Sequence, residues 1–133
     1  MKFIMMMSFK ADKESMTKSI VNWPKQDMEA HIQFMKDFNG RLMKAGEFVD
    51  AQGLAWPAEA KLVRAGRDGQ PITDGVFPES KEFLIGYWII DVDTPERAYQ
   101  IAAQASAAPG PGGEPLNMPI EVRQVMDAPP PPK

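Results

Sequence analysis

The sequence predicts an α+β sandwich in which two helices cover one face of a mostly antiparallel sheet. Two observations support this fold class. Segments of strand length alternate with two longer segments of helical periodicity, and glycine or proline separates most of them. The resulting order is strand, helix, strands, strand, helix, strand, which is the order of a ferredoxin-like sandwich of the dimeric α/β-barrel type.

The first part of the chain contains a strand and a long helix. Lys2 to Phe9 is an apolar run of the length of a buried strand. From Lys25 to Lys44, apolar residues recur with the spacing of one helix face, and Gly46 supplies the stop. These apolar positions are Met28, Ile32, Met35, Phe38 and Leu42. Gly40 inside the helix costs about 1 kcal/mol relative to alanine, and we interpret it as a point where another backbone approaches closely.

The middle of the chain is predicted to be extended. Glu47 to Trp56 forms an extended segment, and Lys61 to Ala65 forms a short strand. The pair Asp68-Gly69 favours a hairpin turn after that strand. The second arm then returns through Pro71 to Thr73 and ends at another turn signal, Asp74-Gly75.

The last part contains the most apolar strand, a second helix and a final strand. Gly86 to Val92 is the apolar strand, and Thr94-Pro95-Glu96 opens the helix with an N-cap, a first-turn proline and an acid at the positive end of the dipole. Ala108 to Pro115 is predicted to be a flexible loop without regular structure, either a plain connection or a lid over a site. Ile120 to Val125 alternates apolar and polar residues, so one of its faces should be buried.

Length and charge limit the classes of protein. The 133 residues, of which 44% are hydrophobic, fit one domain at residues 1–127 and a flexible proline-rich tail at residues 128–133. The net charge is −3 and no basic cluster follows a face, which argues against direct nucleic-acid binding. The apolar N-terminal run is too short for a membrane span, and there is no cysteine, so we expect a cytoplasmic protein.

The sequence predicts no cofactor and no metal. It contains no phosphate loop, no dinucleotide fingerprint and no Gly-x-Ser-x-Gly motif. A single histidine and no cysteine are too few for the usual metal sites, and the acids do not have the spacing of a calcium loop.

The predicted fold leaves one face of the sheet without a cover. Face-to-face dimerisation is the natural way to remove that face from water, so a homodimer is expected. Trp23, Trp56 and Trp88 suggest an aromatic contribution to this interface or to a pocket, and Trp88 is a candidate ligand contact.

Asp74 is the first candidate for catalysis. A carboxylate at a strand end, beside a glycine, can face a cavity, although the pair is also a common turn whose side chain caps its own backbone amides. Glu79, Lys81 and Glu82 follow closely, and they are either ligand contacts or a solvated charged run.

His31 is the second candidate, because it is the only histidine and any imidazole acid or base at neutral pH must be this residue. The alternative is a structural histidine at the edge of the apolar helix face. Pairing with Asp74 would stabilise the imidazolium and favour the catalytic role. Arg64 and Arg123, on two of the predicted strands, complete the candidate ligand contacts.

The segment that starts at Asp74 also resembles a family motif. Asp74-Gly75-Val76-Phe77, followed by Glu79, Lys81-Glu82 and Gly86-Tyr87, is similar to the Asp-Gly-Pro-Phe motif of the YCII-related proteins called DGPF-domain proteins. Further similar stretches occur in the same order, namely Ile90-Asp91-Val92-Asp93, Ala98 and Glu121-Val122-Arg123. Val76 stands where the motif has proline, so this loop has one more free torsion and one more amide donor.

The resemblance implies a ferredoxin-like dimer with a His-Asp pair, and one branch of the family acts as a dehydrochlorinase on a chlorinated hydroxyquinol. The helix histidine of that pair corresponds to Met35 here, one turn after His31 and about 5 Å along the helix axis. The resemblance also implies an association with sigma factors of the extracytoplasmic-function type.

Two functions follow as hypotheses. The leading one is a small-molecule-binding homodimer whose pocket lies near Asp74, His31, Trp88 and residues 109–115, with proton transfer or elimination as its chemistry. The rival is a non-catalytic interaction module that contacts a protein such as a sigma factor. A deep pocket favours the first, and a flat, solvated surface from Asp74 to Glu82 favours the second.

Overall fold

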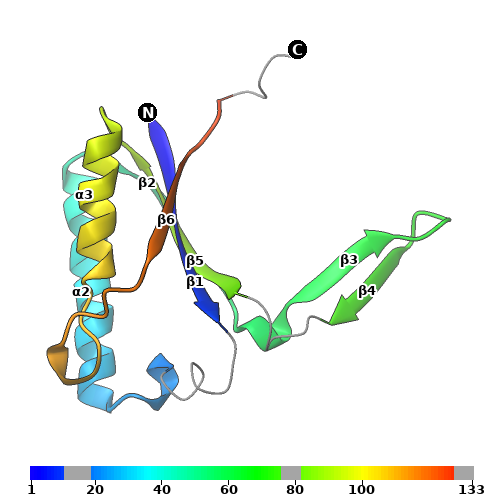
Figure 1. Ribbon diagram of the computed structural model, residues 1–133, viewed down its shortest axis with the longest axis horizontal. Helices are drawn as coiled ribbons and strands as arrows, with labels where there is room; N and C mark the ends of the chain where they lie inside the picture. Colours follow the sequence, from blue (N-terminus) through cyan, green and yellow to red (C-terminus); the bar gives the residue numbers. More distant parts are fainter. Residues whose placement is uncertain (11–18, 76–81, 128–133) are drawn as a thin grey trace.

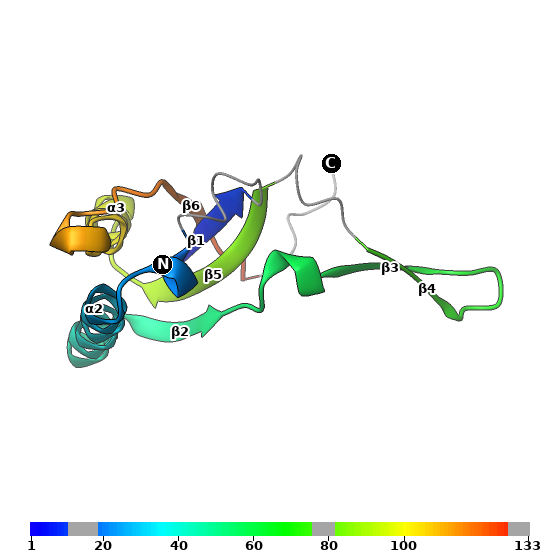
Figure 2. The ribbon, with the colours of Figure 1, turned by 90° about the horizontal axis from the view of Figure 1, so that it is seen from below.

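The computed structural model describes residues 1–10, 19–75 and 82–127, and it has the predicted α+β architecture (Figure 1). Four strands form an antiparallel sheet in the order β2-β5-β1-β6. Two helices lie side by side on one face of this sheet (Figures 1 and 2). The bounds are β1 Lys2–Lys10, α2 Lys25–Lys44, β2 Phe48–Gly53, β5 Glu82–Asp91, α3 Pro95–Ser106 and β6 Ile120–Gln124. The fold is therefore consistent with a ferredoxin-like sandwich.

Both helices begin where the sequence indicates. Helix α2 starts directly after Pro24, and α3 starts after Thr94, whose hydroxyl accepts a hydrogen bond from the Arg97 amide at 3.2 Å. This bond satisfies one of the amides that a first helical turn leaves unpaired. The apolar strand is longer than predicted, because β5 begins four residues before Gly86.

The core fills the space between the helices and one end of the sheet. Phe38 and Leu42 of α2 are buried, and Ile90 of β5 and Ile101 of α3 have no exposed surface. The Phe38 ring meets the Trp88 indole edge-on, with 5.5 Å between ring centroids. We call this region, defined by Phe38, Leu42, Ile90 and Ile101, the closed end of the sandwich.

An ion pair ties α3 to the sheet beside the closed end. The Arg97 guanidinium donates two hydrogen bonds of 2.8 Å to the two carboxylate oxygens of Glu47, which precedes β2. These hydrogen bonds to the charged form hold the pKa of the Glu47 carboxyl below its usual value, and they raise the pKa of Arg97.

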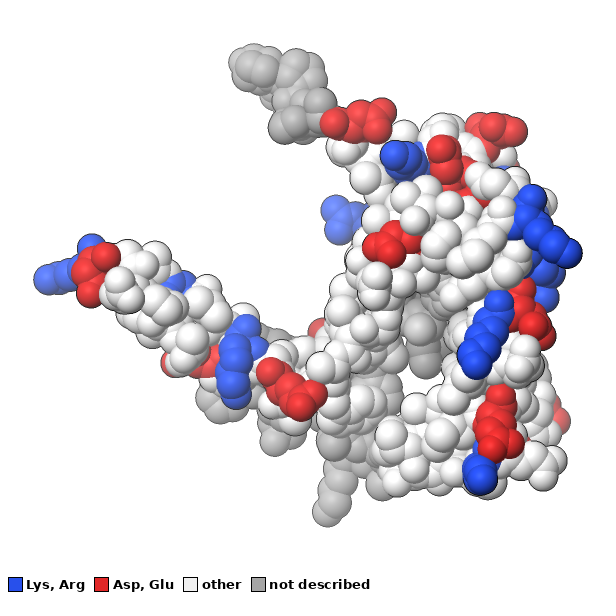
Figure 3. Space-filling view, turned by 180° about the vertical axis from the view of Figure 1, so that it is seen from behind, with Lys and Arg blue, Asp and Glu red and all other residues white. Residues whose placement is uncertain are grey.

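Two further strands form a separate hairpin between β2 and β5. Strand β3 spans Lys61–Ala65 and pairs with β4, Pro71–Gly75, and all ten residues are exposed. The hairpin projects away from the helices and stands apart from the body (Figures 2 and 3). The second arm ends at Asp74-Gly75 as predicted, because β4 ends at Gly75 and Asp74 pairs with Leu62. The residues that would complete a turn after Gly75 lie outside the described residues.

The sheet face opposite the helices carries no other element among the described residues (Figure 2). Ile4 and Met6 of β1 alternate with the core residues of that strand and lie opposite Ile89 and Tyr87 of β5, so these four side chains share the outer face. We call it the open face. The Tyr87 hydroxyl donates a hydrogen bond of 3.1 Å to the Asp50 carboxylate, which raises the pKa of Tyr87 and keeps its hydroxyl protonated.

Two local expectations are wrong. A Cβ added at Gly40 would meet nothing within 4 Å, so no backbone of the described residues approaches there. Residues 108–116 contain a 3₁₀ turn, Pro111–Gly113, and a bridge between Pro109 and Pro115. Gly112 and Gly113 adopt positive φ angles of 69° and 79°, which glycine reaches without strain, so the same glycines that suggested disorder build a tight loop.

Glu79, Lys81 and the tail at residues 128–133 lie outside the described residues, so their predicted roles are not placed. Within the described ranges, neither helix combines the length and the apolar character required to cross a bilayer.

Candidate functional site

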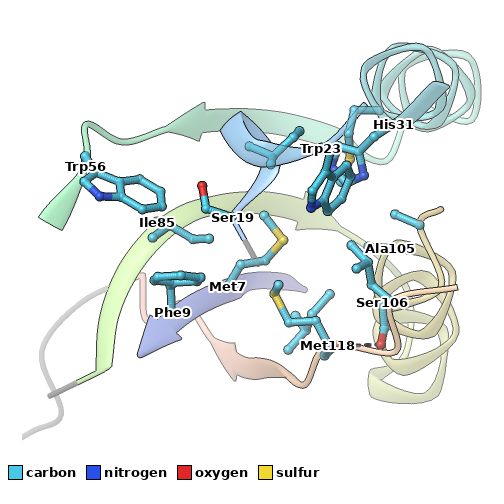
Figure 4. Close-up of a pocket in the computed structure, with 15 residues that line it drawn as sticks. Met7, Phe9, Ser19, Trp23, His31, Trp56, Ile85, Ala105, Ser106 and Met118 are labelled. Carbon is cyan, nitrogen blue, oxygen red and sulfur yellow. Dashed lines mark hydrogen bonds between the residues drawn. The ribbon is translucent and has the colours of Figure 1, made fainter. Parts of the chain in front are cut away.

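A cavity of about 300 Å³ lies between the two helices and the other end of the sheet (Figure 4). Met7 of β1, His31 and Met35 of α2, and Ala105 of α3 line it, and we call this region the open end of the sandwich. The other lining residues are Phe9, Ser19, Ile20, Trp23, Trp56, Ile85, Ser106, Ala108, Leu116, Met118 and Ile120. The cavity is therefore walled mostly by aromatic, methionine and aliphatic side chains.

Side-chain volume explains why this end is hollow. At the closed end, α2 supplies Phe38 and α3 supplies Ile101, and these side chains reach the sheet. At the open end, the facing positions of α3 are Ala105 and Ser106, which are too short to fill the same distance. The Ser106 hydroxyl is also held at the rim, because it donates a 2.7 Å hydrogen bond to the Met118 carbonyl (Figure 4).

A second cavity of about 250 Å³ adjoins the first. The two share Met7, His31, Met35 and Ile85, so His31 lies where they meet. The second cavity reaches towards β2 and Trp88, whose indole N–H donates a 2.8 Å hydrogen bond to the Asn39 side-chain oxygen. The further lining residues are Asn39, Ala51, Gln52, Gly53, Gly86 and Tyr87. We call the two adjoining cavities together the hollow, and the imidazole lies in the wall of both.

His31 is oriented by two contacts. Its Nδ1 lies 2.9 Å from the Pro109 carbonyl oxygen, and because a carbonyl only accepts, Nδ1 carries the proton. The Trp23 indole packs edge-on against the ring, with 5.4 Å between centroids and an angle of 88° (Figure 4). In the neutral imidazole this leaves Nε2 as the acceptor, and no described residue donates a hydrogen bond to it.

The glycine-proline loop is fixed to the same helix. Besides the contact with His31, the Gly112 amide donates a 3.1 Å hydrogen bond to the carboxylate of Asp27, one helical turn earlier. Gly110 cannot be replaced without movement, since an added Cβ would lie 2.6 Å from Leu116 Cδ2. The loop is thus a wall of the cavity, and its own contacts hold it against α2.

The walls of the hollow that the described residues form carry no carboxylate, ammonium or guanidinium group. None of the described side chains that line either cavity belongs to aspartate, glutamate, lysine or arginine. The polar residues that line the first cavity include His31, Ser19 and Ser106. In the second cavity, Asn39, Gln52 and Tyr87 are added to His31. A charged ligand would lose its hydration against these described walls without gaining a counter-ion from them, so they suit a neutral molecule.

The family model for the YCII-related domain matches residues 1–112. The chain belongs to the YCII-related family. The match covers β1, both helices and the β3–β4 hairpin, and it ends within the loop that His31 and Asp27 hold. A comparison with curated proteins finds no match. Among the residues described for this YCII-related protein, no group of three or more histidine, aspartate or glutamate side chains is close enough to hold a metal ion.

The structure brings two of the predicted site residues to one place. His31 and Trp88 both line the second cavity, from α2 and β5 respectively. The predicted aromatic contribution to a pocket is confirmed for all three tryptophans, because Trp23 and Trp56 line the first cavity.

The other predicted site residues of this YCII-related protein lie elsewhere. Asp74 and Arg64 are exposed on the β3–β4 hairpin, and neither lines a cavity in the single chain. Glu82 is exposed at the start of β5, and Arg123 is exposed on the open face. The pairing with Asp74 that would favour a catalytic role for His31 is therefore not present within the described residues of one chain.

Several cavity residues were not predicted from the sequence. Met7 and Met35 were assigned to a strand and to a helix face, and nothing in their spacing distinguishes a core position from a cavity wall. The hydrogen bond from His31 to Pro109 joins residues 78 positions apart. Only the shortening of side chains along the second helix, from Ile101 to Ala105, could have indicated the hollow.

Proposed function

We propose that this protein binds a neutral, largely apolar small molecule that carries an aromatic ring and one hydroxyl group, and that His31 accepts the hydrogen bond of that hydroxyl. The observation that carries the proposal is the hollow at the open end, whose described walls carry no carboxylate, ammonium or guanidinium group and a single imidazole. Apolar cavities with few, well-placed polar groups are typical of small-molecule sites.

The shape and the walls of the hollow support an aromatic ligand. Phe9 and Trp56 form one side, with 5.2 Å between ring centroids, and Trp23 forms another (Figure 4). Aromatic faces and edges favour planar partners, and methionine side chains adapt to irregular shapes beside them. A volume of about 300 Å³ accommodates a molecule of one or two fused rings.

The orientation of His31 supports proton transfer as the chemistry of the site. The Pro109 carbonyl holds the proton on Nδ1, so Nε2 of the neutral ring can take a proton from a bound hydroxyl. In that step the O–H bond breaks, an N–H bond forms, and an oxyanion and an imidazolium result. Elimination is the finer form of the proposal: in a ligand that also carries a conjugated leaving group such as chloride, the electron pair of the oxyanion forms a carbonyl and chloride departs with its bonding pair. Asp74 would take part only if another copy of the chain carried it to the site.

We also propose that the working form is a homodimer joined through the open face. The side chains on this face form rows across the four strands. One row contains Arg123, Ile4, Ile89 and Asp50, and the next contains Glu121, Met6, Tyr87 and Gln52. In the first row the cation and the acid stand at opposite edges of the sheet.

The first row is complementary to the same row of a second copy when that row runs in the opposite direction across the sheet. A two-fold axis parallel to the strands places β6 of one copy over β2 of the other, so that Arg123 faces the partner's Asp50 and Ile4 faces the partner's Ile89. Among the described residues, Arg123 forms an exposed ion pair with Glu121 at 3.7 Å, which is weak. Complementary charges at the rim of an apolar patch favour one orientation of the two copies.

Binding of 2-naphthol and of 2-methoxynaphthalene tests the ligand proposal, because the two probes share a ring system and differ in the hydroxyl proton. By isothermal titration, the wild type should bind 2-naphthol about tenfold more tightly, the value of one hydrogen bond. His31→Phe should remove that preference and keep affinity for both probes. Lys36→Ala, on the exposed side of the same helix, is the matched control and should behave as the wild type. Binding of neither probe by the wild type would contradict the proposal.

A non-catalytic interaction module is the second candidate, with a sigma factor as the partner that the family resemblance implies. The observation that favours it is the hairpin, where Asp74 and Arg64 are exposed beside apolar residues. If the probes do not bind and Asp74→Arg abolishes capture of a sigma factor, this candidate replaces the first.

A further inference from the structure

The β3–β4 hairpin exposes apolar side chains that the described part of its own chain leaves uncovered. Leu62 is 55% exposed, Val63 is 61% exposed and Ile72 is 37% exposed. A hairpin of two strands is only marginally stable in water without further packing. Some other surface is therefore needed to hold it in this extended form.

The two faces of the hairpin differ. Leu62 pairs with Asp74 and Arg64 pairs with Ile72, so these four side chains share one face. The opposite face carries Val63 as its only large apolar side chain, since the other members are Lys61, Ala65, Pro71, Thr73 and Gly75. The face with Leu62 and Ile72 is the one that gains more from being covered.

The hairpin projects on the same side of the sheet as the open face (Figures 1 and 2). In the space-filling view, a wide concave space separates the hairpin from the body (Figure 3). The open face and the hairpin border this space, so one partner seated there would touch both surfaces.

We infer that the hairpin is an arm that clasps a second copy of this chain and lies beside the end of the partner's cavity. The inference rests on the homodimer proposed above. One row across the end of the sheet contains Gly53, Gly86, Met7 and Ile120. The hairpin leaves β2 at this end. The two-fold axis parallel to the strands lays β2 over β6 of the other copy, so the arm meets the partner at the Ile120 end of β6.

That end of β6 belongs to the cavity wall. Leu116, Met118 and Ile120 all line the first cavity. Five residues of an extended strand span about 16 Å, whereas two packed sheets lie about 10 Å apart. An arm that starts at one sheet is thus long enough to pass the edge of the partner's sheet.

Cross-linking tests this arrangement directly, because the chain has no cysteine and each introduced thiol is unique. One chain carries Leu62→Cys. A second chain, with a different tag, carries Pro119→Cys, an exposed position next to β6. When the two are mixed and treated with a short bis-maleimide, we expect a covalent pair of unlike chains. Met43→Cys, exposed on α2 at the closed end, replaces Pro119→Cys as the control and should give no such pair.

The dimer dissociation constant provides a second measurement. Leu62→Ser should weaken the dimer about tenfold or more, because the buried face of both arms loses an apolar side chain. Val63→Ser, the next residue in the same strand but on the other face, should leave the constant within about twofold. Equal effects of the two substitutions, or no effect of either, would overturn the arm.

The outcomes separate this inference from the proposed function. If light scattering gives the dimer mass and 2-naphthol binds, but the thiol at position 62 links to neither position or to both alike, the arm is wrong and the ligand site stands. If the wild type is a monomer at micromolar concentration, both the dimer and the arm are wrong, and naphthol binding still reports on the cavity by itself.

Discussion

The two ends of the helix–sheet sandwich are built from the same helices and the same strands, yet one is solid and the other is hollow. At the closed end, Phe38 and Ile101 reach the sheet and leave almost no exposed surface. At the open end, Met35 and Ala105 occupy the equivalent places on the two helices, and a cavity remains between them and the strands. The difference lies in the volumes of a few side chains and requires no change of backbone.

This difference suggests a division of work along the sandwich. The closed end buries the large side chains and carries the ion pair between Glu47 and Arg97, so most of the stability should reside there. The open end leaves apolar walls and one imidazole without a filling, which lowers stability and leaves space for a ligand. Substitutions at the closed end should therefore mainly lower the free energy of unfolding, whereas substitutions at the open end should mainly change ligand affinity.

The largest expected effect is on the closed end. Phe38→Ala should lower the free energy of unfolding by about 3 to 5 kcal/mol, because a fully buried ring leaves a cavity that the neighbours cannot close. Met35→Ala, one turn earlier on α2, should cost about 1 kcal/mol, since that side chain already borders an empty space. Urea unfolding of both variants measures the contrast. Equal losses would mean that the open end is packed as tightly as the closed end.

Removal of the ion pair should have an intermediate effect that depends on pH. Glu47→Gln should cost about 1 kcal/mol at neutral pH, a modest value because Arg97 is partly exposed. The pKa of Glu47 is lowered in the folded protein, so its contribution is present above the unfolded value of about 4.3 and is lost as the pH falls through the folded value.

The difference in melting temperature between wild type and Glu47→Gln should therefore shrink below about pH 4. Gln33→Ala is a control, because its hydrogen bond to Asp37 is exposed and remote from this pair. A difference that stays constant as the pH falls would show that Glu47 acts through its shape and not through its charge.

The smallest expected effect is a gain in stability. Gly40→Ala should raise the free energy of unfolding by about 0.5 to 1 kcal/mol, since alanine is the better helix former and its Cβ would meet nothing within 4 Å. Thermal unfolding with unchanged naphthol affinity is the expected result. A loss of stability would point to a contact of this helix surface with another molecule.

The fold was predictable because local rules agree with the tertiary structure. The spacing of Met35, Phe38 and Leu42 defines α2, and the Thr94-Pro95 pair defines the start of α3. The loop at residues 108–116 was not predictable, because its order comes from hydrogen bonds to Asp27 and His31 on a distant helix. A high content of glycine and proline predicts the lack of regular structure in a loop, but it does not reveal the distant hydrogen-bond partners that fix its conformation.

The candidate site was predictable only in part. His31 was identified because it is the sole histidine, and Trp88 because aromatic residues often line pockets. Asp74 was identified from a turn signal at a strand end, and β4 does end at the next residue, but the pairing of the hairpin carries Asp74 away from the cavities of its own chain. Strand register over that distance depends on pairing and not on the two residues of a local signal.

Methyl NMR of the methionines tests the central claim most directly. The chain contains ten methionines, of which Met7, Met35 and Met118 line the first cavity and Met43 lies exposed at the closed end. Each methyl resonance can be assigned by a methionine-to-leucine substitution. On titration with 2-naphthol, the resonances of Met7, Met35 and Met118 should shift with one common dissociation constant, and that of Met43 should stay in place. If the three cavity methyl groups do not respond, or if Met43 responds equally, the open end is not a ligand site.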